Sequence, residues 1–103
     1  MKSDYEKALP EEWRDMSRVF SALGDEHRQR ILLLFERGER LTASQIAAVV
    51  PLSRTAVVYH IKTLRDANVL LSEKVGKEVF FWLNIPFVAE AMRRVLKYIN
   101  ENH

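Results

Sequence analysis

The sequence contains no cysteine among its 103 residues. Disulfide bonds, thiol redox sensing, thiolate metal ligands and cysteine nucleophiles are therefore excluded. Histidine is scarce as well, since only His27, His60 and His103 occur and they lie far apart in the chain. Because imidazole and thiolate groups are the usual ligands of transition metals, we expect neither a metal site nor a cofactor.

Long hydrophobic runs are also missing. The longest, ILLLF at 31–35 and VFFWL at 79–83, are far too short to span a bilayer. The N-terminal segment MKSDYEKALPEEW is charged and lacks the apolar stretch of a signal peptide. The sequence thus predicts a soluble, cytoplasmic protein with no membrane contact.

Glycine and proline are rare, with three of each, so they serve as markers of element boundaries. Pro10 and Pro86 suit the first turns of a first and a last helix, at about 10–22 and 86–99. Gly24 and Gly38 are placed to end the first and second helices. Pro51 stops a short third helix.

Polar residues at the expected helix starts support the same division. Asp25 can cap the second helix, and Thr42 and Gln45 have the spacing of a capping box for the third. Ser53 can cap a fourth helix, which closes at Asn68, a residue that tolerates the left-handed conformation.

The hydrophobic period changes after this fourth helix. VLLSEKV and EVFFWLN are rich in β-branched and aromatic residues and are separated by Gly76, which predicts a hairpin at about 70–84. The element order is therefore four helices, a hairpin and a helix. We expect a single domain over 1–103, mainly α with a small β-hairpin, in the α+β class.

Residues 42–67 have the organisation of a helix-turn-helix, a short helix and a tight turn followed by a longer helix. In that motif the second helix buries one face and offers the other to the DNA major groove. Val57, Ile61 and Leu64 form the predicted buried stripe. A hairpin that follows such a helix makes a winged helix. The candidate DNA contacts are Ser53, Arg54, Thr55, Val58, Tyr59, His60 and Lys62 on the helix, with Lys74 and Lys77 on the hairpin.

Side-chain chemistry assigns these candidates different roles. Arg54, at the start of the helix, could read a guanine edge, and Thr55 could bond a base or a phosphate. Tyr59 and Lys62 could reach the sugar-phosphate backbone. Residues 41–82 hold five Lys and Arg against three Asp and Glu, which is compatible with an anionic partner such as double-stranded DNA.

Three segments carry a resemblance to a known family. FSALGDEHRQRILLLF, LTASQIAAVVPLSRTAVVYHIKTLRDANVL and SEKVGKEVFFWLN are similar, in order and spacing over roughly residues 16–84, to the ArsR/SmtB family of bacterial winged-helix transcriptional regulators. The resemblance implies a homodimeric repressor that pairs through its first and last helices. Many such proteins release DNA when a metal or another signal binds.

The resemblance carries over unevenly to individual residues. Ser53, Arg54 and Thr55 match the polar start of the family's recognition helix, and His60 matches a position where histidine is common. Ala56 and Val58 stand where threonine and serine are frequent, which makes the reading face more apolar and favours contact with thymine methyl groups. The metal ligands of the family, cysteines near the third helix or Asp and His pairs on the last, have no counterpart.

The terminal helices suggest self-association. The last helix carries apolar residues on more than one stripe, which a terminal helix of so small a domain rarely buries alone. The alternative is that both helices pack only on their own core. The predicted two-fold interface consists of Trp13, Met16, Phe20, Val88, Met92, Val95 and Ile99.

Other interpretations stay open. Arg54 and Lys62 could be ordinary solvated charges, Tyr59 could pack on the hairpin, and Lys74 and Lys77 could keep an edge strand soluble. A winged helix used for protein–protein contact without DNA is the alternative function. No enzyme motif appears. The inducing signal is undetermined: a small molecule near the dimer interface, a partner protein, or none.

Overall fold

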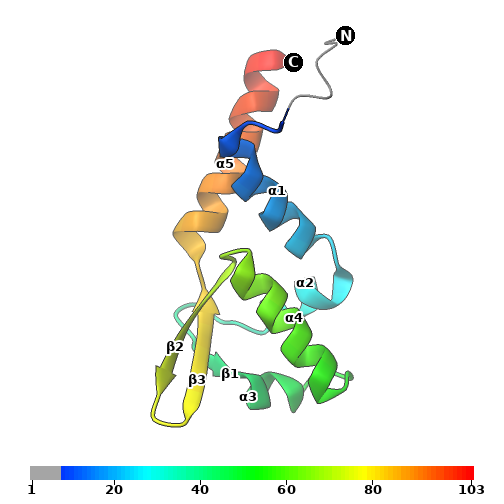
Figure 1. Cartoon of the computed structure of the whole chain (residues 1–103), viewed down its shortest axis with the longest axis vertical. Coiled ribbons are helices and arrows are strands. Elements are labelled where there is room, and N and C mark those ends of the chain that lie inside the picture. The colour runs from blue at the N-terminus through cyan, green and yellow to red at the C-terminus, as the bar shows by residue number, and fades with distance from the viewer. Residues whose placement is uncertain (1–7) are drawn as a thin grey trace.

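The computed structural model describes residues 8–103, and residues 1–7 of the charged N-terminal segment lie outside it. Figure 1 shows an elongated molecule, with α1 and α5 at one end and α3, β1 and the hairpin tip at the other. Within the described part of the chain, no helix is long and apolar enough to cross a membrane. The elements are α1 (Glu11–Leu23), α2 (Glu26–Leu32), β1 (Leu41–Thr42), α3 (Ala43–Ala47), α4 (Arg54–Asp66), β2 (Leu70–Val75), β3 (Glu78–Leu83) and α5 (Ile85–Asn102).

The predicted element order is confirmed, with one addition. The sheet has three strands in the order β1-β3-β2, where the sequence predicts only the β2–β3 hairpin. Leu41 pairs with Phe81 and Thr42 with Phe80, antiparallel. A two-residue strand is too short to show a period of two, so the sequence pattern could not reveal it.

The second helix is shorter than predicted. It ends at Leu32 rather than reaching Gly38, and the chain continues in tighter turns, with Leu34 N donating to Ile31 O at 3.1 Å. Gly38 lies in the loop beyond, at φ 75°. A run of five apolar residues has no periodicity that marks where a helix ends, which explains the error.

The predicted N-terminal helix caps are all present. Asp25 Oδ1 accepts from Arg28 N at 3.0 Å, and Ser53 Oγ accepts from Ala56 N at 3.1 Å. At the start of α3, Thr42 Oγ1 accepts from Gln45 N at 3.2 Å, while Gln45 Oε1 accepts from Thr42 N at 2.8 Å. This reciprocal pair is a capping box, and caps of this kind each contribute about 1 kcal/mol.

The end of α4 controls where the hairpin begins. Asn68 has φ 63°, its N–H donates to Arg65 O at 2.9 Å, and Val69 N–H donates to Leu64 O at 2.9 Å. These two bonds form a Schellman motif around a left-handed residue, as predicted for Asn68. The motif turns the chain so that Val69 and Leu70 enter the core as β2 starts.

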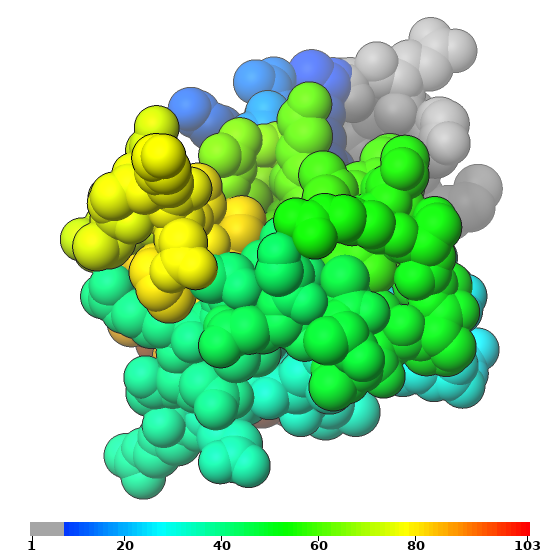
Figure 2. Space-filling model, turned by 90° about the horizontal axis from the view of Figure 1, so that it is seen from below, coloured from blue at the N-terminus to red at the C-terminus, as the bar shows by residue number. Residues whose placement is uncertain are grey.

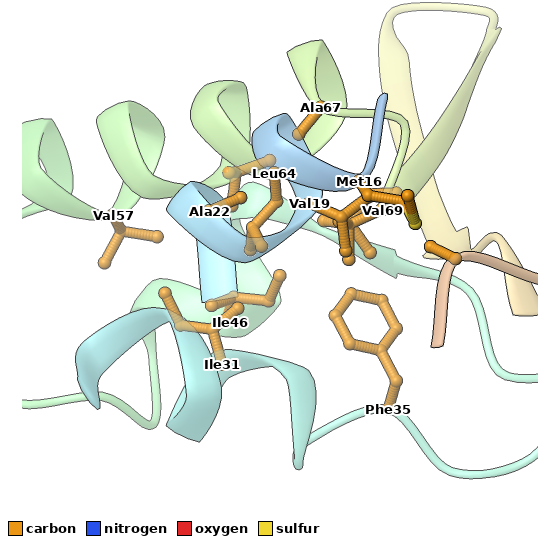
Figure 3. Close-up of a cluster of buried hydrophobic side chains, with 13 residues drawn as sticks. Met16, Val19, Ala22, Ile31, Phe35, Ile46, Val57, Leu64, Ala67 and Val69 are labelled. Carbon is orange, nitrogen blue, oxygen red and sulfur yellow. The ribbon is translucent and has the colours of Figure 1, made fainter. Parts of the chain in front are cut away.

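The core gathers around the inner face of α4 (Figure 3). Val57, Ile61 and Leu64 are buried, which confirms the predicted stripe. Residues from every neighbouring element surround them, so α4 is fixed on one side and leaves its opposite side exposed. The other buried residues are Met16, Val19, Ala22, Ile31, Phe35, Ile46, Ala67, Val69, Leu70 and Ala91.

The hairpin closes through a two-residue turn. Val75 pairs with Glu78, and Gly76 at the first central position has φ 62°. Glycine with positive φ at that position is typical of a type II′ turn, whose twist matches that of the strands. The tight turn brings Lys77 to the tip. We refer to residues 70–83 as the wing.

Candidate nucleic-acid interface

The N-terminal half of α4 presents most of the predicted contacts on the outside of the molecule. Ser53 caps the helix, and Arg54 and Thr55, the first two helical residues, are exposed. Val58 and Tyr59, an apolar and an aromatic side chain next to each other in the helix, are 47% and 62% exposed. Exposure on the side opposite the core leaves this surface available to a partner.

A groove of about 470 Å³ runs between α3, α4 and the wing. Figure 2 shows the face on which these three elements reach the surface together, the wing tip in yellow, α3 in blue-green and α4 in green. Cationic side chains from both α4 and the wing line it. We call it the basic groove; its lining residues are Thr42, Ala43, Ser44, Arg54, Val58, Ile61, Lys62, Arg65, Lys77, Glu78, Val79 and Phe81.

Arg65 is a groove residue that the sequence prediction leaves out. Positions 54, 58, 62 and 65 fall at the i, i+4, i+8, i+11 spacing of one helix face, so Arg54, Val58, Lys62 and Arg65 form one stripe. That spacing is present in the sequence and could have identified Arg65. The stripe extends the cationic surface over the full length of α4.

The charges of the groove are mostly uncompensated. Arg65 Nη2 lies 3.6 Å from Asp66 Oδ1, an exposed pair. Within residues 8–103, Arg54, Lys62 and Lys77 form no ion pair, and Glu78 is the acidic residue in the lining. Free cations around a concave surface concentrate anions there.

The two predicted wing lysines are placed differently. Lys77 lies in the turn and lines the basic groove. Lys74 is exposed on β2 directly opposite Val79, so both side chains leave the same face of the hairpin, yet Lys74 is outside the groove lining. Only Lys77 is brought next to the α4 contacts.

His60 does not line the basic groove, although its ring lies 5.4 Å from that of Tyr59, centroid to centroid. It is half-buried on the side of α4 that faces α2, where its Nδ1 lies 3.2 Å from Arg28 Nη1. Its ring is 5.9 Å from that of His27, centroid to centroid. Burial lowers the pKa of His60, Asp25 raises it, and Arg28 and His27 lower it further, with a net downward shift. A neutral ring can accept the Arg28 hydrogen bond at Nδ1.

The described side chains do not form a set of metal ligands. Within residues 8–103, no group of three or more His, Cys, Asp or Glu side chains is arranged to hold a metal ion. The approach of His27 to His60, which their sequence separation hides, occurs beside the Arg28 guanidinium. A cation at that point disfavours a second cation.

The terminal helices leave an apolar surface at the opposite end of the molecule. Ala91 is the one buried residue of α5, and Trp13 packs edge-on against Tyr98 with ring centroids 5.3 Å apart. Among the predicted interface residues, Phe20, Met92 and Ile99 are exposed, Trp13, Val88 and Val95 are partly buried, and Met16 is buried in the chain's own core.

A short capped helix, a tight turn, a helix with a cationic outer stripe and a β-hairpin wing together define a winged helix-turn-helix protein. A model of the family described as "Helix-turn-helix domain" matches residues 23–73. The transcriptional repressor SdpR of Bacillus subtilis is 29% identical over 86 residues, covering 84% of this chain and 94% of the relative. The SmtB homolog of Synechocystis, a transcriptional repressor, is 29% identical over 89 residues, covering 86% and 67%.

Solved structures show the same similarity. An ArsR-like transcriptional regulator from Rhodococcus sp. RHA1 superposes with a TM-score of 0.78 at 29% identity, covering 86% of this chain and 83% of that one. The homodimeric winged helix-turn-helix DNA-binding domain Mb0332 from Mycobacterium bovis shares the fold, with a TM-score of 0.68 at 22% identity and 99% and 91% coverage. The chain belongs to the ArsR/SmtB family of winged helix-turn-helix, DNA-binding transcriptional regulators.

Proposed function

We propose that this chain is a homodimeric repressor that reads a near-palindromic operator through α4, without control by a Cys or His metal site. The observation that carries the proposal is the basic groove, where α4 and the wing contribute cations to one concave surface. Double-stranded DNA is the polyanion that such a surface fits, because its phosphates flank a major groove wide enough for a helix.

The positions of the cationic residues along α4 support different roles in DNA binding. Arg54 lies at the N-terminal end of the helix, the end nearest the base edges when such a helix enters the groove, and Thr55 follows it. Lys62 and Arg65 lie two and three turns later, where the helix leaves the bases and approaches the phosphates. Arg54 therefore reads sequence, while Lys62 and Arg65 supply affinity.

The wing adds a second anchor. Lys77 extends the basic groove from the hairpin tip, and Lys74 lies on the adjacent strand. Both reach phosphates beside the half-site, and Tyr59, exposed on α4, bonds the backbone on the other side of the helix. These contacts hold the recognition helix in register without reading bases.

Dimerisation is supported by the terminal helices. Leu96 is 58% exposed and shares one face of α5 with Met92 and Ile99, by their i, i+4, i+7 spacing, while Phe20 is exposed on α1. Pairing two such surfaces about a two-fold axis removes this area from water and places the two α4 helices in successive major grooves, roughly 34–36 Å apart. The similar Mb0332 domain is a homodimer. Because its target is the chromosome, the repressor acts in the cytoplasm.

The proposal is tested by fluorescence anisotropy of the purified chain. The probes are a duplex from upstream of its own coding sequence and a scrambled duplex of equal composition, titrated across a salt series with and without zinc. The proposal requires tighter binding to the native duplex that persists as salt rises and is unchanged by zinc. Lys62→Glu should lower affinity on both duplexes, whereas the matched Arg30→Glu on α2, outside the groove, should not.

Two results would contradict the proposal. Release of DNA by zinc would overturn the absence of metal control. Failure to bind any duplex at low salt would favour the alternative function, a winged helix that contacts proteins.

A further inference from the structure

We propose that Val58 reads the C5 methyl group of a pyrimidine, supplied by thymine, at one base pair in each half-site. The inference rests on the proposed function, because it names what the middle of α4 recognises once the helix lies in the major groove. It assigns sequence selectivity to a side chain that can form no hydrogen bond.

The position of Val58 in the basic groove is the first argument. It lies on the stripe one turn after Arg54 and one turn before Lys62, so its neighbours along the helix face are both cations. If those cations contact DNA on either side, the side chain between them is held against the base edges. Val58 thus faces the floor of the major groove.

Its exposure is the second argument. Five apolar residues line the groove, and Val58 at 47% is more exposed than Val79 at 38% or the buried Ile61. Closure of the interface removes water from Val58, and this is favourable when the surface opposite is apolar as well.

The chemistry of the base edges identifies the group that Val58 contacts. In the major groove each base pair presents hydrogen-bond donors and acceptors, and the thymine methyl is the apolar group among them. A valine opposite cytosine or a purine would leave a polar group without water or a partner, which is costly. A 5-methylpyrimidine instead presents Val58 with an apolar methyl group, so less polar surface loses its water.

The test begins with a selection. Duplexes with about 20 random base pairs, enough for two half-sites one helical turn apart, are enriched on the wild-type chain. Each thymine of the selected site is then replaced in turn by deoxyuridine, which removes the methyl group and nothing else. Removal of the methyl group that meets Val58 should weaken binding about fourfold, since a buried methyl-sized group contributes roughly 0.8 kcal/mol.

Variants connect that effect to Val58. With Val58→Ala, the sensitive thymine should become insensitive to deoxyuridine replacement, while Val49→Ala, which changes an exposed valine outside the groove, should keep the full fourfold effect. As Val58 is half-exposed, both variants should fold, which circular dichroism checks. At the same position, 5-methylcytosine should bind more tightly than cytosine if the methyl group itself is read.

The outcomes separate this inference from the proposed function. A selected site that binds tightly but tolerates deoxyuridine at every position would overturn the role of Val58 and leave the regulator intact. If deoxyuridine replacement weakened binding equally in the wild type and in Val58→Ala, the role of Val58 would likewise be overturned and the regulator left intact. Failure to enrich any sequence, with no duplex bound at low salt, would overturn both.

Discussion

Arg28 Nη1 lies 3.2 Å from His60 Nδ1, and this contact joins α2 to the outward-facing helix α4. The same guanidinium donates from Nε to Ala22 O at 2.6 Å and from Nη2 to Ser21 O at 3.3 Å, at the end of α1. One side chain therefore links three helices. Ser21 O also accepts from Gly24 N–H at 3.4 Å, whereas Ala22 O belongs to the last turn of α1, where helix carbonyls lack partners within the helix. Arg28 therefore caps the C-terminal end of α1 and positions α4.

Arg28→Ala should destabilise the fold. The substitution leaves the Ala22 carbonyl without its donor, while Ser21 O keeps only its bond from Gly24 N–H, so the free energy of unfolding should fall by about 1–3 kcal/mol. Urea denaturation followed by circular dichroism measures it. Arg30→Ala is the matched control, because Arg30 forms an exposed i,i+4 pair with Glu26 and should cost less than about 1 kcal/mol. Equal destabilisation of the two variants would contradict the linking role.

Stability should also depend on pH through His60. Burial lowers the pKa of His60 below its usual 6.5, so the unfolded chain takes up the proton at higher pH than the folded chain does. In that window the unfolded state binds more protons, and the free energy of unfolding must decrease as the pH falls below 6.5. A protonated His60 would also forfeit the Arg28 bond and face its cation. Asp25 opposes this shift, while His27 and Arg28 reinforce it.

His60→Asn separates this effect from the other titrations. An asparagine Oδ1 can take the place of Nδ1 as acceptor for Arg28 but does not titrate. The variant should therefore lose part of the dependence of unfolding free energy on pH between about pH 5 and pH 7. His103→Asn, at the exposed C-terminus, should retain the wild-type slope. An unchanged slope in His60→Asn would refute the assignment.

Local signals in the sequence predict much of this fold. A helix cap requires only a polar side chain and the backbone N–H of the residue three positions later. The caps at Asp25, at Ser53 and in the Thr42–Gln45 box could therefore all be predicted from the sequence. The buried stripe of α4 follows from helical spacing alone. These features depend on neighbours in the chain, and the structure confirms them.

Features that depend on contacts between residues far apart in the chain could not be predicted from the sequence. β1 exists because Leu41 and Thr42 meet β3 some forty residues later, and two residues carry no pattern of their own. The side of α4 that His60 occupies is defined by Arg28, 32 residues away. Arg65 differs, because helical spacing alone puts it on the groove stripe with Arg54 and Lys62.

A charge on the exposed face of α5 should separate the proposed dimer. Ile99 is 47% exposed, so Ile99→Glu should leave the protomer folded while placing an unpaired carboxylate in the interface. Sedimentation equilibrium should show a monomer, with weaker operator binding because a monomer engages a single half-site. Val49→Glu, which changes an exposed valine in the turn after α3, should stay dimeric. A dimeric Ile99→Glu would place the interface elsewhere.

Removing the wing charges should weaken binding without changing selectivity. Lys74→Ala together with Lys77→Ala should lower affinity equally on operator and scrambled duplexes, because phosphate contacts carry no sequence information. The slope of log K against log salt should become shallower by about 0.9 for each phosphate that the variant no longer neutralises. Arg30→Ala with Arg37→Ala removes the same net charge away from the groove and should keep the slope. An unchanged slope in the lysine variant would remove the wing from the interface.

Arg54 and Arg65 should behave differently although both line the basic groove. Arg54 begins α4 and should read a base, so Arg54→Ala should cost about 1–3 kcal/mol on the operator and much less on scrambled DNA. Arg65 ends the same stripe, three turns along, where the proposed binding mode brings only phosphate within reach. Arg65→Ala should therefore weaken both duplexes to the same extent. Anisotropy titrations of the two variants at one salt concentration compare them directly, and equal weakening on both duplexes for Arg54→Ala would show that the start of α4 does not read sequence.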